Sequence, residues 1–568
     1  MGSKFTRKDI IILTIIMLVY SVIAFVNLGD SIAPETFWEN ESGEQITLEL
    51  DEITYIDRIN IYNGRLSADE KNHTVEVLVD DEVTSTVNFA LGSVFCWESI
   101  DIKAAANKLL LKTNGYIGEI VIYSEDGELI EIRSVTDYNG DSIPEIFDEQ
   151  NAAVYQPSFK NGTYFDEIYH ARTAYEYING IEAYEWTHPP LGKLIISIGI
   201  SIFGMNPFGW RIMGTLAGIM MLPIMYVMAK TLFKKTAYAA FACVLFSFDF
   251  MHFAQTRIAT IDVYATFFIM LMYLFMYKFY EENYNVTGIK KVLKYLAFAG
   301  VCFGLGAASK WTSVYAGAGL AVIFAIYMVK RFTEYRRYNP KNYIKNTIKT
   351  LLWCVLFFVI IPIGIYILSY LPYAFIEQGG FTFENIWRIQ ENMFKYHSGL
   401  SATHPFSSQW YEWPLMTKPI WYHVTRLPDE RIMTISAFGN PAIWWVGIPA
   451  AAVTAYYAMT DKKNKWLPFL VLIGYASQYL PWALIGRVVF IYHYFPSVPF
   501  VVLMITYAVK RLYERAKNKK NVIAGVGVYL AIVIALFVMF YPAISGVETD
   551  QSYVKNVLTW FDGWYIGG

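Results

Sequence analysis

The chain has 568 residues, of which 55% are hydrophobic and 17% are charged. Soluble domains carry roughly a quarter charged residues, so this composition, with a mean hydropathy of +0.32, excludes an ordinary soluble protein and predicts a polytopic membrane protein. The formal net charge of -3 does not identify a partner, because the positions of the charges matter more than their sum, and we expect no nucleic-acid partner. The four cysteines, Cys96, Cys243, Cys302 and Cys354, show no disulfide framework.

The first predicted membrane span runs from about Ile10 to Leu28, which is close to the ~20 apolar residues that a spanning helix needs. Basic residues precede it, and the sequence from Asn27 to Ser31 has no small-residue cleavage site. These features favour an uncleaved anchor over a secretory signal peptide. We therefore assign residues 1–29 to a first transmembrane helix.

Residues 30–158 form a predicted inserted extracytoplasmic β domain. Short β-rich segments alternate with Asp, Asn and Gly turns, which is typical of an antiparallel sandwich. The segments are 46–50, 59–62, 74–79, 83–89, 100–102, 108–112 and 117–123. The pattern loosely resembles the jelly-roll modules of the discoidin and carbohydrate-binding type. Such a domain either binds a glycan or the acceptor, or serves as a spacer or folding cap.

Asp137 opens a short acidic loop that resembles the start of a calcium-binding loop. That type of loop needs Gly at its sixth position and Glu at its twelfth. Here the two positions hold Ser142 and Asp148. A polar linker is therefore the favoured interpretation, and we expect no metal site.

The segment 159–206 is the predicted first external loop of the membrane part and carries the strongest local signal. Adjacent acids, Asp166 and Glu167, directly precede an amphipathic stretch that predicts a helix. Further on, the sequence Thr187-His188-Pro-Pro-Leu-Gly-Lys193 adds a histidine and a lysine. Acidic and basic side chains therefore gather in one loop beside the membrane.

Ten further apolar segments predict about eleven membrane spans in all. They are 207–229, 236–254, 258–279, 293–309, 312–330, 349–370, 437–459, 466–482, 487–509 and 521–543. Helices two to seven thus occupy residues 207–370, and helices eight to eleven occupy residues 437–543. Between them lies a large external loop, 371–436, and an external tail, 544–568, follows the last span.

Lys and Arg concentrate in alternate short loops, as the positive-inside rule requires of cytoplasmic loops. The basic segments are the N-terminus and residues 230–235, 278–294, 330–349, 462–465 and 510–520. Their consistent phase predicts a cytoplasmic N-terminus, an extracytoplasmic C-terminus and an odd number of spans. We expect the chemistry on the external face, where the two long segments 30–206 and 371–436 lie.

Several charged residues stand at the predicted external ends of spans. A charge at the centre of the bilayer costs about 2.5–3.5 kcal/mol, and the cost falls toward a helix end. For Arg211, Arg257 and Asp262, interfacial anchoring or an internal ion pair is the alternative to a role in function. Arg487 and His493 have the same alternative. The common placement of these residues favours a functional site.

Transfer of a sugar from a lipid phosphate would use such a set of residues. The leaving group is a phosphate anion of low pKa, so it needs cations rather than a general acid. The acceptor hydroxyl needs a general base, and one carboxylate suffices for inversion. A retaining mechanism would need two carboxylates on opposite sides of the sugar, whereas adjacent residues usually diverge. The acidic pair therefore favours an inverting transfer.

Several short motifs, taken in order, resemble the protein O-mannosyltransferase family of the GT-C superfamily, whose members use sugars linked to lipid phosphates. The motifs are Tyr164-Phe-Asp166-Glu167, His188-Pro-Pro-Leu-Gly-Lys193, Gly209-Trp-Arg211-Ile-Met-Gly214, Gln255-Thr-Arg257-Ile-Ala-Thr-Ile-Asp262, Ser309-Lys-Trp-Thr312, His404-Pro-Phe-Ser-Ser-Gln-Trp-Tyr-Glu-Trp-Pro-Leu415 and Tyr492-His493-Tyr-Phe-Pro496. The resemblance covers the first span and nearly all of residues 160–510. It implies a GT-C-like fold of about eleven transmembrane helices, into which the β domain is inserted.

The resemblance also implies roles for the candidate residues. Asp166 is the expected catalytic base or acceptor-orienting group, and Glu167 is its expected catalytic partner. Arg211 is expected to bind the donor phosphate, and Arg487 and His493 are further candidates for that role. The expected substrate-binding residues are His188, Lys193, Arg257, Asp262, Trp410 and Trp413, of which the two tryptophans would stack on a sugar.

The implied partners are a polyprenyl- or dolichyl-phosphate-linked sugar donor, a secreted or membrane protein acceptor, and the lipid bilayer, with no cofactor and no metal. Two departures from the family's pattern matter. Residues 371–436 are too few for the β-trefoil module of eukaryotic members, which favours a bacterial type in the cell membrane. In addition, the β domain separates the first span from the acidic pair, where family members have a short connection, so the acceptor stays open.

Three other functions agree with parts of the sequence. A GT-C transferase that modifies a lipid or cell-wall glycan would differ only in its acceptor. A transporter would favour internal repeats and interrupted helices near the membrane midplane, and no clear repeat is visible. A sugar-binding receptor would use only the β domain. Transfer of a mannosyl or other hexosyl unit to a protein hydroxyl is the favoured prediction.

Overall fold

The computed structural model describes residues 5–40, 43–65, 73–376, 380–461 and 465–567. The chain divides into two compact units, each described by itself. One unit comprises Asn27–Ile178 and Ile196–Ile212 and holds the β domain and the acidic pair. The other comprises Met1–Val26, Asn179–Ile195 and Met213–Gly568 and holds most of the membrane helices.

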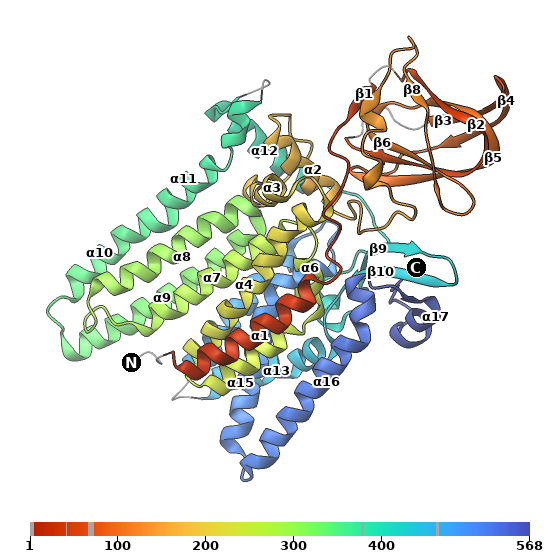
Figure 1. Cartoon of the computed structure of the whole chain (residues 1–568). Coiled ribbons are helices and arrows are strands. Elements are labelled where there is room, and N and C mark those ends of the chain that lie inside the picture. The colour runs from red at the N-terminus through yellow and green to blue at the C-terminus, as the bar shows by residue number, and fades with distance from the viewer. Residues whose placement is uncertain (1–4, 41–42, 66–72, 377–379, 462–464, 568) are drawn as a thin grey trace. The chain divides into compact units, whose positions relative to one another are not determined.

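The inserted domain is an antiparallel sheet of eight strands, which confirms the predicted β domain (Figure 1). The strands are β1 (Trp38–Asn40), β2 (Gln45–Asn63), β3 (His73–Val79), β4 (Glu82–Phe89), β5 (Cys96–Lys112), β6 (Gly115–Tyr123), β7 (Leu129–Ile130) and β8 (Ser134–Thr136). Their order is β1-β6-β2-β5-β3-β4, with β7 beside β6 and β8 beside β2. The predicted β-rich segments all fall inside these strands, because the alternation of apolar and polar residues is a local signal.

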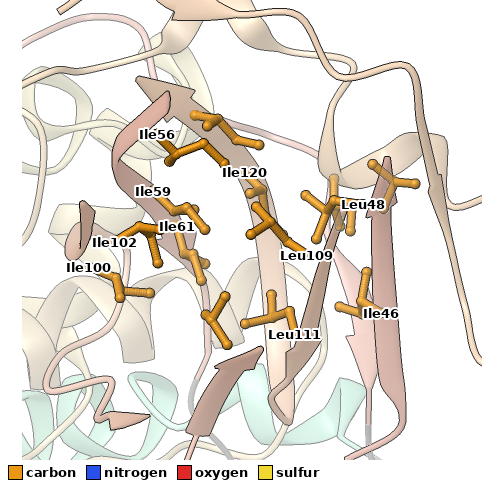
Figure 2. Packing of buried hydrophobic residues seen from close by; sticks show 14 of the residues in the cluster. Ile46, Leu48, Ile56, Ile59, Ile61, Ile100, Ile102, Leu109, Leu111 and Ile120 are labelled. Carbon is orange, nitrogen blue, oxygen red and sulfur yellow. The ribbon is translucent and has the colours of Figure 1, made fainter. Parts of the chain in front are cut away.

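One continuous sheet, rather than the two separate sheets of a sandwich, encloses the core of this domain. The pairing of the long strands β2 and β5 shifts register twice near the middle of β2, and such bulges bend strands. Side chains from both ends of β2 therefore reach the same core. Ile46 and Leu48 come from one end, Ile59 and Ile61 from the other, and all four are buried in one cluster (Figure 2).

Buried Glu119 is expected to make the stability of the β domain depend on pH. Burial raises the pKa of Glu119 on β6 from 4.5 to about 7. Folding therefore favours the protonated form of Glu119. The corresponding contribution to the free energy of unfolding is fully present below pH 4.5 and is lost as the pH rises through about 7. The loss amounts to at most about 3 kcal/mol. We expect Glu119→Gln to slow hydrogen–deuterium exchange of residues 115–123 relative to the wild type at pH 8, and to do so much less at pH 5. An equal difference at the two pH values would contradict this account.

After β8 the chain turns at Asp137. Its carboxylate accepts hydrogen bonds from the backbone N–H groups of Asn139 (2.9 Å) and Asp141 (2.8 Å). The carboxylate thus closes a turn, as expected of a polar linker. Two 3-10 turns, η1 (Pro144–Ile146) and η2 (Gln150–Ala152), precede α2 (Glu167–Ile178).

Ten of the described helices are long and apolar enough to cross a membrane, or eleven if the bent pair α5 and α6 counts as one span. This result confirms the predicted polytopic membrane fold. The helices are α1 (Arg7–Phe25), α4 (Pro207–Phe233), α5 (Thr236–Ser247), α6 (Phe250–Thr256), α7 (Asp262–Glu281), α8 (Ile289–Ser309), α9 (Val314–Tyr338), α10 (Tyr343–Val355) with η4 (Leu356–Ile360) and α11 (Ile361–Leu368), α13 (Pro441–Thr460), α14 (Trp466–Tyr479), α15 (Val498–Arg515) and α16 (Lys519–Ser545). Of the predicted basic loop 462–465, residues 462–464 lie outside the described residues.

The predicted span 236–254 is in fact two helices, α5 and α6, which meet at 60°. Asp249 marks the break. Its carboxylate accepts a hydrogen bond from the backbone N–H of His252 (3.1 Å) and another from the indole N–H of Trp444 (2.8 Å). A capping carboxylate satisfies backbone donors that the start of a helix leaves unpaired. The average hydropathy of a sequence window does not reveal a helix break that depends on a single residue.

Segment 371–436, which was predicted to be a large external loop, contains regular structure. It includes α12 (Phe383–Gly399), the 3-10 helix η6 (Trp410–Leu415) and a hairpin of β9 (Ile420–Arg426) and β10 (Arg431–Ala437). From the C-terminal tail, β11 (Thr549–Asp550) pairs with β10 and is followed by α17 (Gln551–Tyr553) and η9 (Val554–Leu558). Residues 377–379 of the loop lie outside the described residues.

Candidate functional site

A cavity of about 430 Å³ in the membrane unit is the candidate substrate site. Four stretches of chain line it: the loop before α3 (Leu191–Phe203), the start of α9, the end of α12 and the segment after α14. The size lies in the range of sites for small molecules. Its lining includes Lys310, Arg487, His188 and His397, and no described lining residue is Asp or Glu. Such a lining suits an anionic ligand.

Lys310 is a cavity residue that the predicted site did not include. It lies between α8 and the 3-10 turn η3 (Trp311–Ser313). Its Nζ lies 2.8 Å from each carboxylate oxygen of Asp262, the first residue of α7, and both side chains are buried. Asp262 therefore forms an internal ion pair, and it acts on the cavity by holding Lys310. The sequence contained a signal for Lys310, namely the motif Ser309-Lys-Trp-Thr312.

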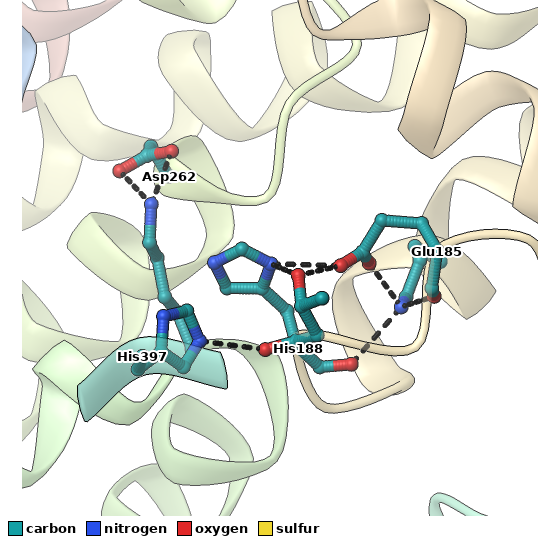
Figure 3. A network of polar contacts seen from close by, with 7 residues as sticks. Glu185, His188, Asp262 and His397 are labelled. Carbon is teal, nitrogen blue, oxygen red and sulfur yellow. Dashed lines mark hydrogen bonds and ion pairs between the residues drawn. The ribbon is translucent and has the colours of Figure 1, made fainter. Parts of the chain in front are cut away.

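A buried polar network holds the loop that presents His188 (Figure 3). Glu185 accepts a hydrogen bond from Lys193 Nζ (2.6 Å) and pairs with His188 Nδ1 (3.0 Å). Lys193 is fully buried and also donates to the backbone oxygens of Glu185 and His188. Of the two predicted residues, His188 thus lines the cavity, whereas Lys193 supports the loop. Glu185, three residues before His188, was missing from the predicted site.

The imidazoles of His188 and His397 are neutral near pH 7. Burial lowers the pKa of His188. Burial, together with the nearby His188, Arg487 and Lys310, lowers the pKa of His397 to about 4. His397 Nε2 lies 2.7 Å from the backbone oxygen of Thr187, so this nitrogen carries the proton, and Nδ1 carries the lone pair. The two cationic residue types of the lining are Lys310, which Asp262 pairs, and Arg487, which no described carboxylate pairs.

Arg487 and His493 occupy different environments, although both were predicted to contact the phosphate. Arg487 lines the cavity and is only partly buried, and no carboxylate of the described chain pairs with it. His493 is 5% exposed and does not belong to the described lining. Its Nδ1 accepts a hydrogen bond from the backbone N–H of Phe490 (3.1 Å), and its ring stacks on Trp413. The geometry favours a phosphate role for Arg487 and a packing role for His493.

Three other predicted substrate residues lie outside the cavity lining. Trp413 is fully buried, and its indole N–H donates to the backbone oxygen of Ser408 (3.1 Å). Because no face of its ring reaches solvent, the predicted sugar stacking has no surface at this residue. Trp410 is partly exposed and packs against Tyr479. Arg257 is 4% exposed and donates to backbone oxygens at the ends of α1 and α16, which indicates a structural clamp.

In the other unit, Glu167 and Arg211 form an ion pair with both side chains fully buried. All five guanidinium N–H groups of Arg211 have acceptors. Nε and Nη2 bind the two oxygens of Glu167 at 2.8 and 2.7 Å, and the rest bind the backbone oxygens of Leu28, Phe159 and Gly162. No N–H group of Arg211 is left for a phosphate in this conformation. The pair instead fixes the chain that carries the neighbouring acid.

That neighbour, Asp166, is partly exposed and directly precedes α2. Its backbone oxygen accepts the N–H of His170 (3.1 Å), which starts the helix. The residue before it, Phe165, has a φ of +50°, a strained conformation for an aromatic residue that costs on the order of 1–3 kcal/mol and is concentrated at functional sites. The Glu167–Arg211 pair and this strained backbone together hold Asp166 in a defined position.

Among the described residues, one group of carboxylates is close enough to share a metal ion. Glu119, Asp148 and Glu149 of the β domain have oxygens within 4.8 Å of one another. Glu119 accepts the backbone N–H of Glu149, and Glu149 accepts those of residues 35 and 36. These hydrogen bonds account for the cluster without an ion.

Comparisons with known proteins identify the family. A model of the dolichyl-phosphate-mannose-protein mannosyltransferases matches residues 151–374, and a model of the C-terminal four-helix membrane region of protein O-mannosyltransferase matches residues 382–564. The polyprenol-phosphate-mannose–protein mannosyltransferase of Mycobacterium tuberculosis H37Rv is 25% identical over 70% of this chain and 86% of its own length. The same-named protein of Corynebacterium glutamicum is 24% identical over 66% and 81%.

The structure of the Saccharomyces cerevisiae protein O-mannosyltransferase Pmt1–Pmt2 complex bound to the sugar donor has a TM-score of 0.62. It is 13% identical and is matched over 71% of this chain and 89% of that one. This likeness concerns the fold, which is that of GT-C membrane glycosyltransferases. The two family models together span most of the chain and follow the β domain. The chain is a multi-pass membrane protein that belongs to the protein O-mannosyltransferase family of glycosyltransferases.

Proposed function

We propose that this protein transfers a mannosyl unit, with inversion, from a polyprenyl-phosphate carrier to Ser or Thr hydroxyl groups of translocated proteins. Family membership supports the reaction class, and the names of the bacterial relatives support the donor and the acceptor. The observation that carries the proposal is the cavity, in which Arg487 supplies a positive charge and Lys310, paired with Asp262, supplies a charged N–H donor, with no carboxylate in the described lining.

In the proposed reaction, Lys310 and Arg487 bind the donor phosphate and stabilise the charge that develops on it. The acceptor oxygen attacks the anomeric carbon as the bond from that carbon to the phosphate oxygen breaks. The hydroxyl proton passes to Asp166, and the leaving phosphate needs no proton because it is a stable anion. The buried Glu167–Arg211 pair positions Asp166.

We further propose that the protein lies in the cell membrane with its N-terminus in the cytoplasm and its C-terminus and active site outside. The phase of the Lys- and Arg-rich loops supports this orientation. It would expose the cavity to proteins that have crossed the membrane. Labelling of single cysteines at residues 30–40 and 510–520 with a membrane-impermeant reagent tests it, since only the first group should react in intact cells.

The position of the β domain in the chain bears on the identity of the acceptor. Both family models begin after the β domain, at residue 151 or later, so this domain is an addition to the matched region. The added domain either recognises the protein acceptor or adapts the enzyme to a different acceptor, such as a lipid or cell-wall glycan. Profiling peptide, lipid and glycan acceptors with the full chain separates these possibilities.

A transfer assay tests the reaction itself. Purified protein is mixed with polyprenyl-phosphate-mannose and a Ser/Thr-rich peptide, and mannosylated peptide is measured by mass spectrometry. We expect product only when the donor carries mannose on a phosphate. If neither this donor nor other carrier-linked sugars give product with any acceptor, the proposed enzymatic function is wrong.

Arg487→Gln is expected to raise the KM for the donor about tenfold, because it removes one of the cations that face the phosphate. The KM for the peptide should stay unchanged. Lys395→Gln is the control, since Lys395 is an exposed cation on α12 outside the described cavity lining. Equal donor KM values for Arg487→Gln and Lys395→Gln would remove Arg487 from the phosphate site.

A further inference from the structure

A second cavity, of about 970 Å³, is lined by residues of α13, α15 and α16. These helices, which Figure 1 labels, are far along the chain from the acidic motif. Most of its lining is apolar and includes Val446, Val453, Leu512 and Val526. Gly525 on α16 also lines it, and a Cβ atom there would meet no heavy atom within 4 Å. The space beside α16 is therefore open in the structure.

A hydrocarbon chain is the ligand that suits these walls. All three helices are long and apolar enough to cross a membrane, and only 11% of the apolar window of α16 is buried. Water gains no hydrogen bonds in an apolar cavity, and an empty space forfeits the dispersion contacts of its lining. Lipid tails of the surrounding bilayer supply those contacts.

The same cavity has a basic end. Arg511 and Arg515, from the last turns of α15, line it with their guanidinium carbons 4.1 and 4.9 Å from the centre of the Tyr457 ring. Arg511 pairs with Asp461 (3.3 Å) and with Glu514 (3.2 Å), but its Nε–H is buried without an acceptor among the described residues. Arg515 forms no ion pair with any described carboxylate. A binding site that combines apolar walls with arginines fits an amphiphile with a negative head group.

The surrounding chain strengthens this charge pattern. Residues 510–520 contain six Lys or Arg residues and one Glu. Basic pockets between membrane helices on the cytoplasmic side, where the proposed orientation places residues 510–520, bind anionic lipid head groups. We propose that the groove between α13, α15 and α16 binds an anionic phospholipid, whose acyl chain packs on Val453 and Val526 and whose phosphate meets Arg511 and Arg515. The bound lipid would fill the space between α16 and its neighbours.

Native mass spectrometry of the full chain tests whether the groove prefers a lipid with an anionic head group. The protein is titrated with phosphatidylglycerol and with phosphatidylcholine of the same acyl chains, and lipid-bound fractions are compared. We expect preferential binding of phosphatidylglycerol. Arg515→Gln should weaken it about fivefold, the effect of roughly one cation near the surface. Lys517→Gln removes a charge from the same segment outside the described lining and should change the affinity less than about twofold.

Two glycines of α16 test the location. Gly525→Leu fills the cavity and should abolish retention of phosphatidylglycerol. Gly527→Leu is the matched control, because Gly527 also has open space around its Cβ position but does not line the cavity among the described residues. If Gly525→Leu yields no folded protein by size-exclusion chromatography, Val453→Phe narrows the groove from α13 instead.

Three results would overturn the proposal. Equal affinity for the two phospholipids would show that charge plays no part. Wild-type binding by a folded Gly525→Leu or Val453→Phe variant would place the lipid elsewhere. Undecaprenyl phosphate that displaces phosphatidylglycerol at a lower concentration would assign the groove to a carrier lipid rather than to a phospholipid.

Discussion

Asp166→Asn is expected to lower the turnover number for peptide mannosylation about 10²–10⁴-fold, the usual contribution of a general base. Asparagine has nearly the same shape and cannot accept the proton of the acceptor hydroxyl. The five N–H groups of Arg211 bind Glu167 and backbone oxygens rather than the carboxylate of Asp166. The variant should therefore keep the thermal stability of the wild type and its donor KM. Steady-state kinetics and a thermal unfolding curve provide the measurements.

Asp141→Asn is the matched control for this substitution, because Asp141 is an exposed aspartate in the same unit. It should retain full activity. Wild-type turnover by a folded Asp166→Asn variant would exclude Asp166 as the base. The next candidate would then be His188, which lines the cavity and is oriented by Glu185. In that case Glu185→Gln should lower the turnover number, whereas in the present proposal it mainly loosens the loop.

The fold was accessible from sequence because its signals are local. Membrane spans appear as long apolar runs and the β domain as alternation, and both depend on neighbours within a few residues. The sequence did not reveal the break at Asp249, where one capping carboxylate bends the chain. Nor did it reveal that β2 bends, since a bulge changes the pairing of strands without changing the pattern of either strand.

The site was only partly accessible, because its residues come together through tertiary contacts. Lys310 and His397 lie on segments far from the acidic motif, and nothing in their immediate sequence places them beside His188. Arg211 and Trp413 illustrate the opposite situation. Both have the residue type of a binding group, yet both are fully buried and saturated by protein partners. A sequence motif identifies a residue with a functional role. The burial of that residue decides whether it contacts the ligand itself or positions another residue that contacts the ligand.

Arg211 offers the sharpest test of that distinction. We expect Arg211→Met to lower the free energy of unfolding by about 3–5 kcal/mol, because it leaves Glu167 buried without its cation. Methionine fills similar space, so the loss comes from the unpaired carboxylate and from the backbone oxygens of Leu28, Phe159 and Gly162. The free energy of unfolding is measured by chemical denaturation, monitored through hydrogen–deuterium exchange of residues 159–178. Arg133→Met, at an exposed arginine of the same unit, should change the stability by less than about 0.5 kcal/mol.

Arg211→Lys separates support from phosphate binding. Lysine keeps the positive charge but has three donors and no planar fork, so it cannot reproduce the five hydrogen bonds of Arg211. If Arg211 acts by support, the variant should be less stable and have a lower turnover number, with the donor KM unchanged. If Arg211 instead contacts the carrier phosphate during the reaction, the donor KM should rise while stability holds. Glu167→Gln provides the second arm. It should reduce stability as Arg211→Met does, because each single change leaves the other member of the buried pair without its charged partner. The double variant leaves neither charge behind, so it should lose less stability than the sum of the two single variants.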